Sequence, residues 1–171
     1  LVAQEIARLK YGFPVFCGVE VKATVFGDVL VFGCCRDFAR NIEWPVLRST
    51  VRQAGGVLIP AHPFRRWDRF ALWHYLEQKG LSLNGRLTDN GNFEGLTAIE
   101  VQNAGCRPEE NAQAAELAHL LALPGVGGSD AHWQTRVGRA ATRFPDTITT
   151  DAEMVAALKE GNYQAVTRRV K

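Results

Sequence analysis

Gly127-Gly128-Ser129-Asp130-Ala131-His132 directly follows an apolar run over 120–126. Its two glycines allow a tight backbone turn. Asp130 and His132 occupy alternate positions, so at the end of an extended strand their side chains point the same way. A carboxylate and an imidazole are both ligands of first-row transition metals. The spacing alone is a weak signal of a metal site, and its weight depends on motifs upstream.

Strand patterns alternate with helix patterns along the whole chain. The strands at 15–23 and 29–32 are close enough in sequence to pair as a hairpin. The segment 81–95 is polar, which predicts a surface loop. The alternation predicts βαβ units and a mainly parallel sheet. The other predicted strands are 57–61, 96–102, a strand leading into Ser129, 137–142 and 163–167, and the predicted helices are 2–10, 44–54, 68–79, 108–122 and 152–160.

Three further polar residues stand where ligands are expected in such a fold. His62 directly follows the apolar strand 57–61, and Asn103 follows the strand 96–102. Sites in α/β folds lie where the strands end. Glu20 lies within an apolar strand, where a carboxylate is costly to bury unless it meets a metal or a cation. These positions predict that Glu20 and His62 belong to the same site as Asp130 and His132.

Length and composition indicate one ordinary globular domain over residues 1–171. Hydrophobic residues make up 46% of the chain and the formal net charge is +2, which is too small to indicate a nucleic-acid partner or a membrane surface. No apolar stretch is long enough to span a bilayer. The four cysteines form no Cys-x-x-Cys pair, and we expect reduced thiols in a cytoplasmic protein. The chain lacks an initial Met, and we expect it to begin inside a longer reading frame.

Taken together, four motifs resemble those of the PHP (polymerase and histidinol phosphatase) superfamily in their order and intervals. The resemblance covers essentially the whole chain. It implies an α/β fold, a PHP-like distorted (β/α)7 barrel, which here lacks the first strands and their His-x-His motif. Asp28 stands where some members have a further histidine ligand, and we interpret it as a turn residue. The motifs are Gly18-Val19-Glu20-Val21, 27–33, 55–63 and Gly128-Ser129-Asp130-Ala131-His132.

The resemblance also implies a centre of two or three divalent metals that hydrolyses phosphate esters. Glu20 would bridge metals, His62, Asp130 and His132 would each be ligands, and Asn103 would line the site. Mixed histidine and carboxylate ligands suit Zn, Mn or Fe. Arginines bind phosphate through a planar fork of donors, so Arg65 and Arg139 are candidates for substrate binding.

The predicted function is a metal-dependent phosphoesterase acting on a small phosphorylated metabolite or nucleotide. The alternative is a catalytically impaired PHP-like remnant that binds a phosphorylated ligand or a partner protein, which the missing His-x-His favours for this chain. Amide hydrolysis on a related barrel has less support, because such sites commonly use a lysine that bridges metals, and no lysine follows a strand end here. An incomplete barrel exposes strand edges, so self-association is also expected.

Overall fold

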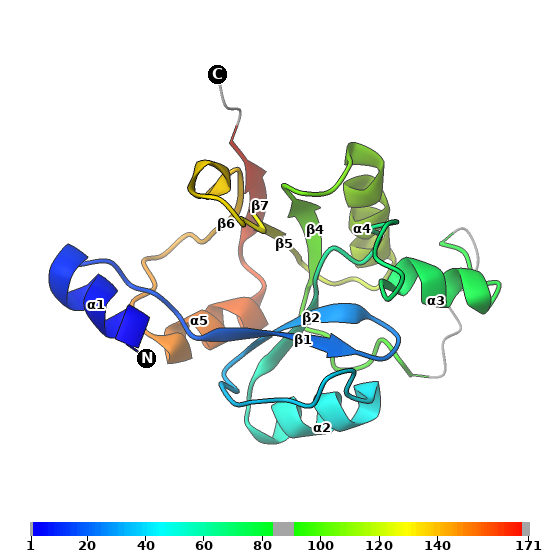
Figure 1. Ribbon diagram of the computed structural model, residues 1–171, viewed down its shortest axis with the longest axis horizontal. Coiled ribbons are helices and arrows are strands. Elements are labelled where there is room, and N and C mark those ends of the chain that lie inside the picture. Colours follow the sequence, from blue (N-terminus) through cyan, green and yellow to red (C-terminus); the bar gives the residue numbers. More distant parts are fainter. Residues whose placement is uncertain (1, 84–90, 169–171) are drawn as a thin grey trace.

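The computed structural model describes residues 2–83 and 91–168, and 84–90 of the predicted surface loop lie outside the described residues. Strands and helices are mixed along the chain, as Figure 1 shows, and the predicted α/β class is confirmed. A short 3₁₀ turn, η1, spans Gln134–Arg136. The helices are α1 (Val2–Tyr11), α2 (Trp44–Gln53), α3 (Leu72–Gln78), α4 (Pro108–Leu120) and α5 (Asp151–Glu160), and the strands are β1 (Gly18–Ala23), β2 (Gly27–Phe32), β3 (Val57–Pro60), β4 (Ile99–Asn103), β5 (Gly125–Gly128), β6 (Ala140–Arg143) and β7 (Gln164–Thr167).

The described strands form three sheets, and the prediction of a mainly parallel sheet is wrong. Strands β1, β2 and β3 pair antiparallel in that order, and so do β6 and β7, whereas β4 and β5 are parallel. The predicted hairpin of β1 and β2 is confirmed. Strand β3 runs antiparallel to β2 because the chain first returns along β1, where Ile42 forms a parallel bridge to Ala23. Helix α2 then begins near the end of β1 and carries the chain back, so that β3 starts at Val57, which pairs with Phe32 at the end of β2.

The three sheets follow one another but do not close into a barrel within the described residues. Pairs of hydrogen bonds join them. Thr97 N–H donates to the Leu58 carbonyl at 2.9 Å and Leu58 N–H donates to Thr97 Oγ1 at 3.4 Å. Gly127 N–H donates to Thr142 Oγ1, and Thr142 Oγ1 donates to the Gly127 carbonyl, both at 3.0 Å. Strand β1 is at an edge of its sheet and pairs with Ile42 only at one end. Self-association through such an edge stays a prediction.

The main hydrophobic core packs helices α2, α3 and α4 and strand β4 against the first sheet. Val29 and Val31 alternate inward along β2 and are fully buried, as the two-residue period of a strand requires. Trp44 begins α2 and packs edge-on against Phe26, with ring centroids 4.6 Å apart. Burying each such side chain contributes on the order of 2 kcal/mol. This core fixes β1, β2 and β3 relative to one another, and their polar side chains form the candidate site.

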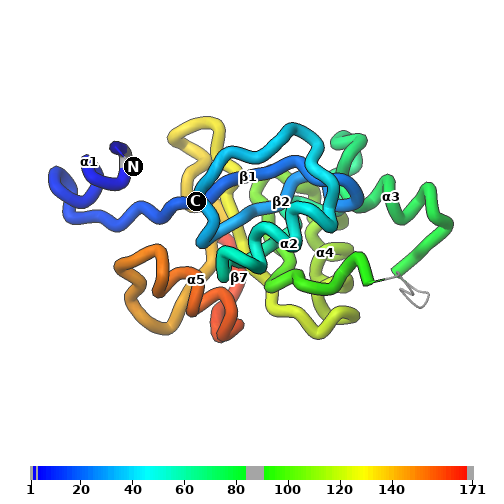
Figure 2. Tube along the Cα trace, turned by 90° about the horizontal axis from the view of Figure 1, so that it is seen from below, coloured from blue at the N-terminus to red at the C-terminus, as the bar shows by residue number. Residues whose placement is uncertain are grey.

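Helix α1 projects from the body of the molecule in the ribbon view and in the Cα trace (Figures 1 and 2). Its apolar residues Val2, Ile6 and Leu9 are exposed. None of the helices in the described part of the chain has the length and hydrophobicity needed to cross a bilayer. A cytoplasmic location stays a prediction.

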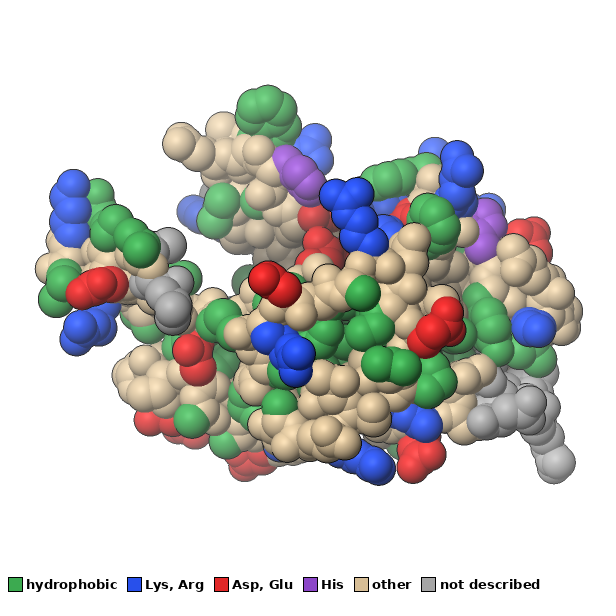
Figure 3. Space-filling view, turned by 60° about the horizontal axis from the view of Figure 1, so that its bottom comes forward, with side chains coloured by type: hydrophobic (Ala, Val, Ile, Leu, Met, Phe, Trp, Pro, Cys, Tyr) green, Lys and Arg blue, Asp and Glu red, His purple; other side chains and the backbone are tan. Residues whose placement is uncertain are grey.

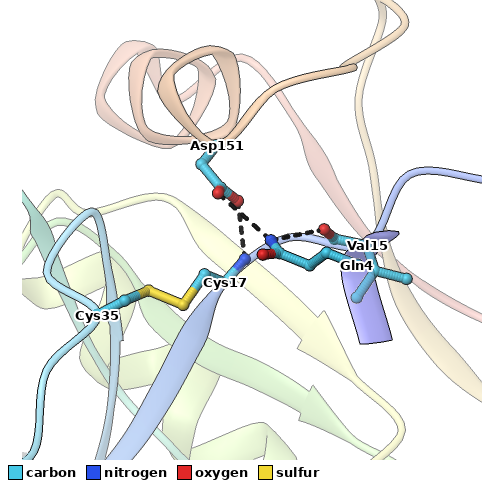
Figure 4. The surroundings of a disulfide bond; sticks show 5 residues. All are labelled: Gln4, Val15, Cys17, Cys35 and Asp151. Carbon is cyan, nitrogen blue, oxygen red and sulfur yellow. Dashed lines mark hydrogen bonds between the residues drawn. A yellow bond between two sulfur atoms is a disulfide. The ribbon is translucent and has the colours of Figure 1, made fainter. Parts of the chain in front are cut away.

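A disulfide joins Cys17 to Cys35, so the prediction that all cysteines are reduced is wrong for this pair (Figure 4). The hairpin register places Gly18 opposite Phe32, and Gly33 turns the chain with a φ of 77°, which brings Cys35 back toward Cys17. Their Cα atoms are 6.3 Å apart, within disulfide range. Cys34 and Cys106 are free thiols. Reasoning from local cysteine spacing missed a pairing that the hairpin creates.

Candidate metal centre

Three ligand-type side chains from one sheet meet beside β1. Glu20 lies in β1, Asp28 lies in β2, and His62 comes two residues after β3. One ligand atom from each lies within 4.8 Å of the other two. His62 Nε2 is 3.4 Å from Glu20 Oε1 and 3.9 Å from Asp28 Oδ2. The structure therefore brings together two predicted ligands, Glu20 and His62, and adds Asp28. We call these three residues the open cluster.

Asp28 is part of strand β2 and is not the turn residue that the sequence indicated. Its backbone pairs with Lys22 in the β1–β2 ladder, and its carbonyl accepts from Ala61 N–H at 2.9 Å. These pairings place its side chain beside His62. The sequence interpretation is wrong because β2 already begins at Gly27, two residues before the predicted strand 29–32, so that Asp28 lies within it.

Lys22 provides a positive charge at the edge of the open cluster. Its Nζ lies 2.9 Å from Asp28 Oδ1 and 3.7 Å from Asp68 Oδ2. Burial alone would lower the pKa of Lys22, but the hydrogen bond and charge of Asp28 outweigh it and raise the pKa. The other Asp28 oxygen, Oδ2, faces His62. Asp28 can therefore keep its ion pair while one oxygen is directed into the cluster.

The open cluster has donors that fit a divalent cation. An imidazole and two carboxylates match the ligand preferences of Zn, Mn and Fe. The His62 side chain is 4% exposed and that of Glu20 is 49% exposed, so the cluster has a buried base and an open side. His62 Nδ1 is buried without a hydrogen-bond partner among the described residues, and Nε2 is the nitrogen directed at the carboxylates. His62 also has a φ of 32°, in a region that non-glycine residues rarely occupy and that is concentrated at functional sites.

Asp130 belongs to a second group, in which Arg65 is its partner. Arg65 is buried, and its Nη2 donates to Asp130 Oδ2 and, at 3.0 Å, to Asn103 Oδ1. Burial alone would raise the pKa of Asp130, but the hydrogen bond and charge of Arg65 outweigh it and hold this pKa below its ordinary value. Burial alone would lower the pKa of Arg65, but the hydrogen bond and charge of Asp130 help to raise it above its ordinary value. The carboxylate of Asp130 is thus stabilised by a cation of the chain itself.

Glu100 connects this second group to the open cluster, and the sequence analysis did not identify it. It is buried in β4, where its Oε2 accepts from His62 N–H at 2.7 Å and from Asn103 Nδ2 at 3.1 Å. Burial raises its pKa, although these two hydrogen bonds act in the opposite direction. The signal was available, because Glu100 stands in an apolar strand as Glu20 does. Arg65, Glu100, Asn103 and Asp130 are called the closed network below.

Gly128 is a glycine because Glu100 occupies the adjacent space. A Cβ at Gly128 would collide with Glu100 Oε1, which lies across the parallel β4–β5 pair. The two glycines before Asp130 therefore permit close packing rather than the tight turn expected from the sequence. The positive φ, 45°, falls instead on Asp130. Because β5 ends at Gly128, Asp130 and His132 lie beyond the strand and do not alternate along it as the sequence predicted.

The remaining predicted site residues have different surroundings. The side chain of His132 is 79% exposed, and its Nδ1 lies 3.0 Å from the carbonyl oxygen of Asp130. Arg139 is exposed, and its Nε donates to the Thr135 carbonyl at 3.2 Å, without contact to the open cluster or the closed network. Asn103 is buried inside the closed network. In this structure neither Asp130 nor His132 lies among the three grouped ligand atoms of the open cluster.

A cleft of about 610 Å³ opens beside the cluster. One wall is β1 with Glu20 and the side chain of Asp28, and the other is the segment 35–40 that follows the disulfide. Acidic and basic side chains are interspersed with hydrophobic ones over the face shown in Figure 3. The open cluster is thus accessible from a cavity large enough for a small organic phosphate.

Comparison with known families matches the C-terminal part of the chain. Residues 108–163, about a third of the chain, match the family described as PHP-associated. This match supports a PHP superfamily assignment. It covers Asp130 and His132, and Glu20, Asp28 and His62 lie outside it. The predicted resemblance to the PHP superfamily is confirmed for residues 108–163.

One protein and two solved structures give the wider comparison. The uncharacterized protein MJ0417 of Methanocaldococcus jannaschii is 26% identical over 145 residues, which are 83% of this chain and 55% of that protein. The crystal structure of PsfC from Pseudomonas syringae PB-5123 superposes with a TM-score of 0.67 at 21% identity, over 93% of this chain and 62% of PsfC, and shows the fold. A proposed metal-dependent phosphoesterase from Bifidobacterium adolescentis gives a TM-score of only 0.40 at 22% identity, over 73% of this chain and 39% of that one, too low to establish a shared fold. The chain spans 55% and 62% of the lengths of the first two.

Proposed function

We propose that the protein is a metal-dependent phosphoesterase that hydrolyses a phosphate ester of a small metabolite or nucleotide. The observation that carries the proposal is the open cluster, in which Glu20, Asp28 and His62 direct ligand atoms at one another beside a cleft. The PHP-associated match supports the same class of function. For a complete site we expect two or three Zn, Mn or Fe ions in a closed barrel, with Asp130 and His132 as further ligands.

The chain's own residues would divide the work as follows. Glu20, Asp28 and His62 would hold a divalent metal, which supplies Lewis-acid activation of water and phosphate when bound. The carboxylate of Glu100 accepts a hydrogen bond from the backbone N–H of His62 and so holds the backbone of His62 in place. Lys22 keeps one oxygen of Asp28 in place while the other faces the cluster. Arg65 would have to release Asp130 before that carboxylate could reach a metal.

A second candidate function is binding without turnover, and the closed network favours it. Asp130 and Arg65 already satisfy each other, and His132 is exposed, so the described chain presents fewer grouped ligands than the resemblance implies. Such a protein would bind a phosphorylated ligand or a partner protein through the cleft. It would keep binding after metal removal, whereas an enzyme would lose turnover.

The test is release of inorganic phosphate from p-nitrophenyl phosphate and a panel of nucleotides and sugar phosphates, with Mn²⁺, Zn²⁺ or Fe²⁺ added. We expect metal-dependent release that falls by at least about a hundredfold in His62→Ala, because loss of a ligand removes the activated water. His119→Ala is the matched control, since His119 is exposed on α4. Turnover that survives chelation, or that His62→Ala leaves unchanged, would contradict the proposal.

A further inference from the structure

The cleft beside the open cluster is bounded by a segment that is held at both ends. At one end the disulfide ties Cys35 to Cys17, directly before β1. At the other end Ile42 N–H donates to the Lys22 carbonyl at 3.0 Å, and Thr24 N–H donates to the Ile42 carbonyl at 3.0 Å. Phe38, between these ends, packs against the main core. The segment 35–40 therefore has a defined position opposite Glu20.

Two arginines of this segment, Arg36 and Arg40, line the cleft with unused donors. Both are exposed, and neither side chain makes a hydrogen bond or ion pair with a described residue. Arg65 differs, because it is buried and its Nη2 already donates to Asn103 and Asp130. A guanidinium offers five N–H donors in a planar fork suited to carboxylate or phosphate. Arg36 and Arg40 are therefore available to a ligand in a way that the predicted Arg65 is not.

The charge balance of the cleft indicates when an anion would bind. The cleft also contains the carboxylates of Glu20, Asp28 and Asp37, and Lys22 is already paired with Asp28. Without a metal these acids offset the two arginines. A divalent cation on Glu20 and Asp28 leaves the cleft positive, so an anionic ligand is expected to bind with the metal rather than before it.

We propose that the cleft holds the organic part of the substrate, and that Arg36 and Arg40 recognise a second anionic group, a carboxylate or a phosphate, on that part. The substrate class is then a phosphate ester whose organic part carries a further anionic group, and not a phosphate ester whose organic part is uncharged. This inference rests on the proposed function, because the scissile phosphate is placed at the open cluster. It assigns specificity to a segment that lies outside the family match.

The test compares two ligands that differ only in the second anion. Dissociation constants of phenyl phosphate and 4-carboxyphenyl phosphate are measured by calorimetry on the whole chain, with and without Mn²⁺. We expect the carboxylated ester to bind at least about tenfold more tightly in Mn²⁺, the gain of one good charge-assisted contact. The double variant Arg36→Gln/Arg40→Gln should lose this preference. Arg52→Gln, an exposed arginine of α2 that does not line the cleft, should keep it.

The outcomes separate this inference from the proposed function. Equal binding of the two esters by the wild-type protein, or a preference that survives in the double variant, overturns the role of Arg36 and Arg40 even if phosphate is released. A preference lost only in the double variant supports the role, and absence of phosphate release in the same samples would then overturn the hydrolase alone. Circular dichroism of the double variant establishes that it is folded.

Discussion

The open cluster and the closed network contain similar residues and use them in opposite ways. In the open cluster, Glu20 and Asp28 direct oxygens at His62, and the side chain of Glu20 is 49% exposed to the cleft. In the closed network, the carboxylate of Asp130 is bound by Arg65, and that of Glu100 accepts two N–H groups. In the open cluster, oxygens of two carboxylates and a nitrogen of a buried imidazole lie within 4.8 Å of one another.

The difference shows that residue type does not identify a ligand until its partners are known. A buried carboxylate must be paired or hydrogen-bonded, and the closed network meets that requirement with protein groups. The open cluster meets it only in part, through Lys22 on one oxygen of Asp28. A divalent cation would complete the coordination of the open cluster, and it would have to compete with Arg65 for Asp130.

Removing Glu100 should break the closed network and have the largest effect on stability. Glu100→Ala leaves the N–H of His62 and the amide of Asn103 without their buried acceptor and opens a cavity. We expect a loss of roughly 4 kcal/mol in the free energy of unfolding, measured by urea denaturation. Glu116→Ala on the exposed face of α4 is the control and should change it by less than about 0.5 kcal/mol. A similar small change for Glu100→Ala would show that the network does not hold these strand ends.

Reducing the disulfide should increase the mobility of the segment 35–40 that lines the cleft and leave the closed network unchanged. The Cys17–Cys35 bridge spans 18 residues, and its loss should cost about 3 kcal/mol in unfolding free energy. Dithiothreitol should therefore destabilise the wild-type protein, and should have no effect on Cys17→Ser/Cys35→Ser. Hydrogen exchange should accelerate in 33–41 and not in 99–103. Equal acceleration in both segments would mean that the two regions are not independent.

Glu110 supports the segment beside the closed network, and it gives a smaller, pH-dependent effect. Its oxygens accept from Arg66 N–H at 2.9 Å and Arg107 N–H at 2.8 Å. Burial alone would raise its pKa, but these hydrogen bonds outweigh it and lower the pKa. The stabilisation is thus present above the unfolded-state pKa of about 4.3 and is lost as the pH falls through the lower folded-state value.

Glu110→Gln should therefore be less stable than the wild-type protein by about 1 kcal/mol at pH 7, because an amide accepts these donors less strongly. The difference should shrink toward zero under acidic conditions below pH 4. Urea denaturation at several pH values measures it. A deficit that stays constant across that range would show that the charge of Glu110 does not matter.

The sequence predicted those parts of the site that depend on burial along a single strand. Glu20 and His62 were identified because an acid within an apolar strand and a histidine after one need a partner, and the same reasoning applies to Glu100. Asp28 was missed because its role depends on where β2 begins. Sequence could not show that Arg65 is buried against Asp130, since that contact joins residues 65 positions apart.

The larger departures from prediction have the same physical cause, which is how distant segments return to one another. Strand β3 is antiparallel because the chain first runs back along β1 to Ile42. The same return places Cys35 beside Cys17 and the segment 35–40 opposite Glu20. Local patterns located most helices and strands within a few residues, but the direction of β3 and the cleft are set by this one long connection.

The most direct test of the metal centre is Mn²⁺ affinity of the whole chain, measured by electron paramagnetic resonance titration of free Mn²⁺. Asp28→Asn should weaken binding by at least about tenfold, because it removes an anionic ligand from the open cluster. Asp37→Asn, an exposed acid of the same cleft, should bind as the wild type does. If Asp28→Asn binds Mn²⁺ as tightly as the wild type, the open cluster is not the metal centre.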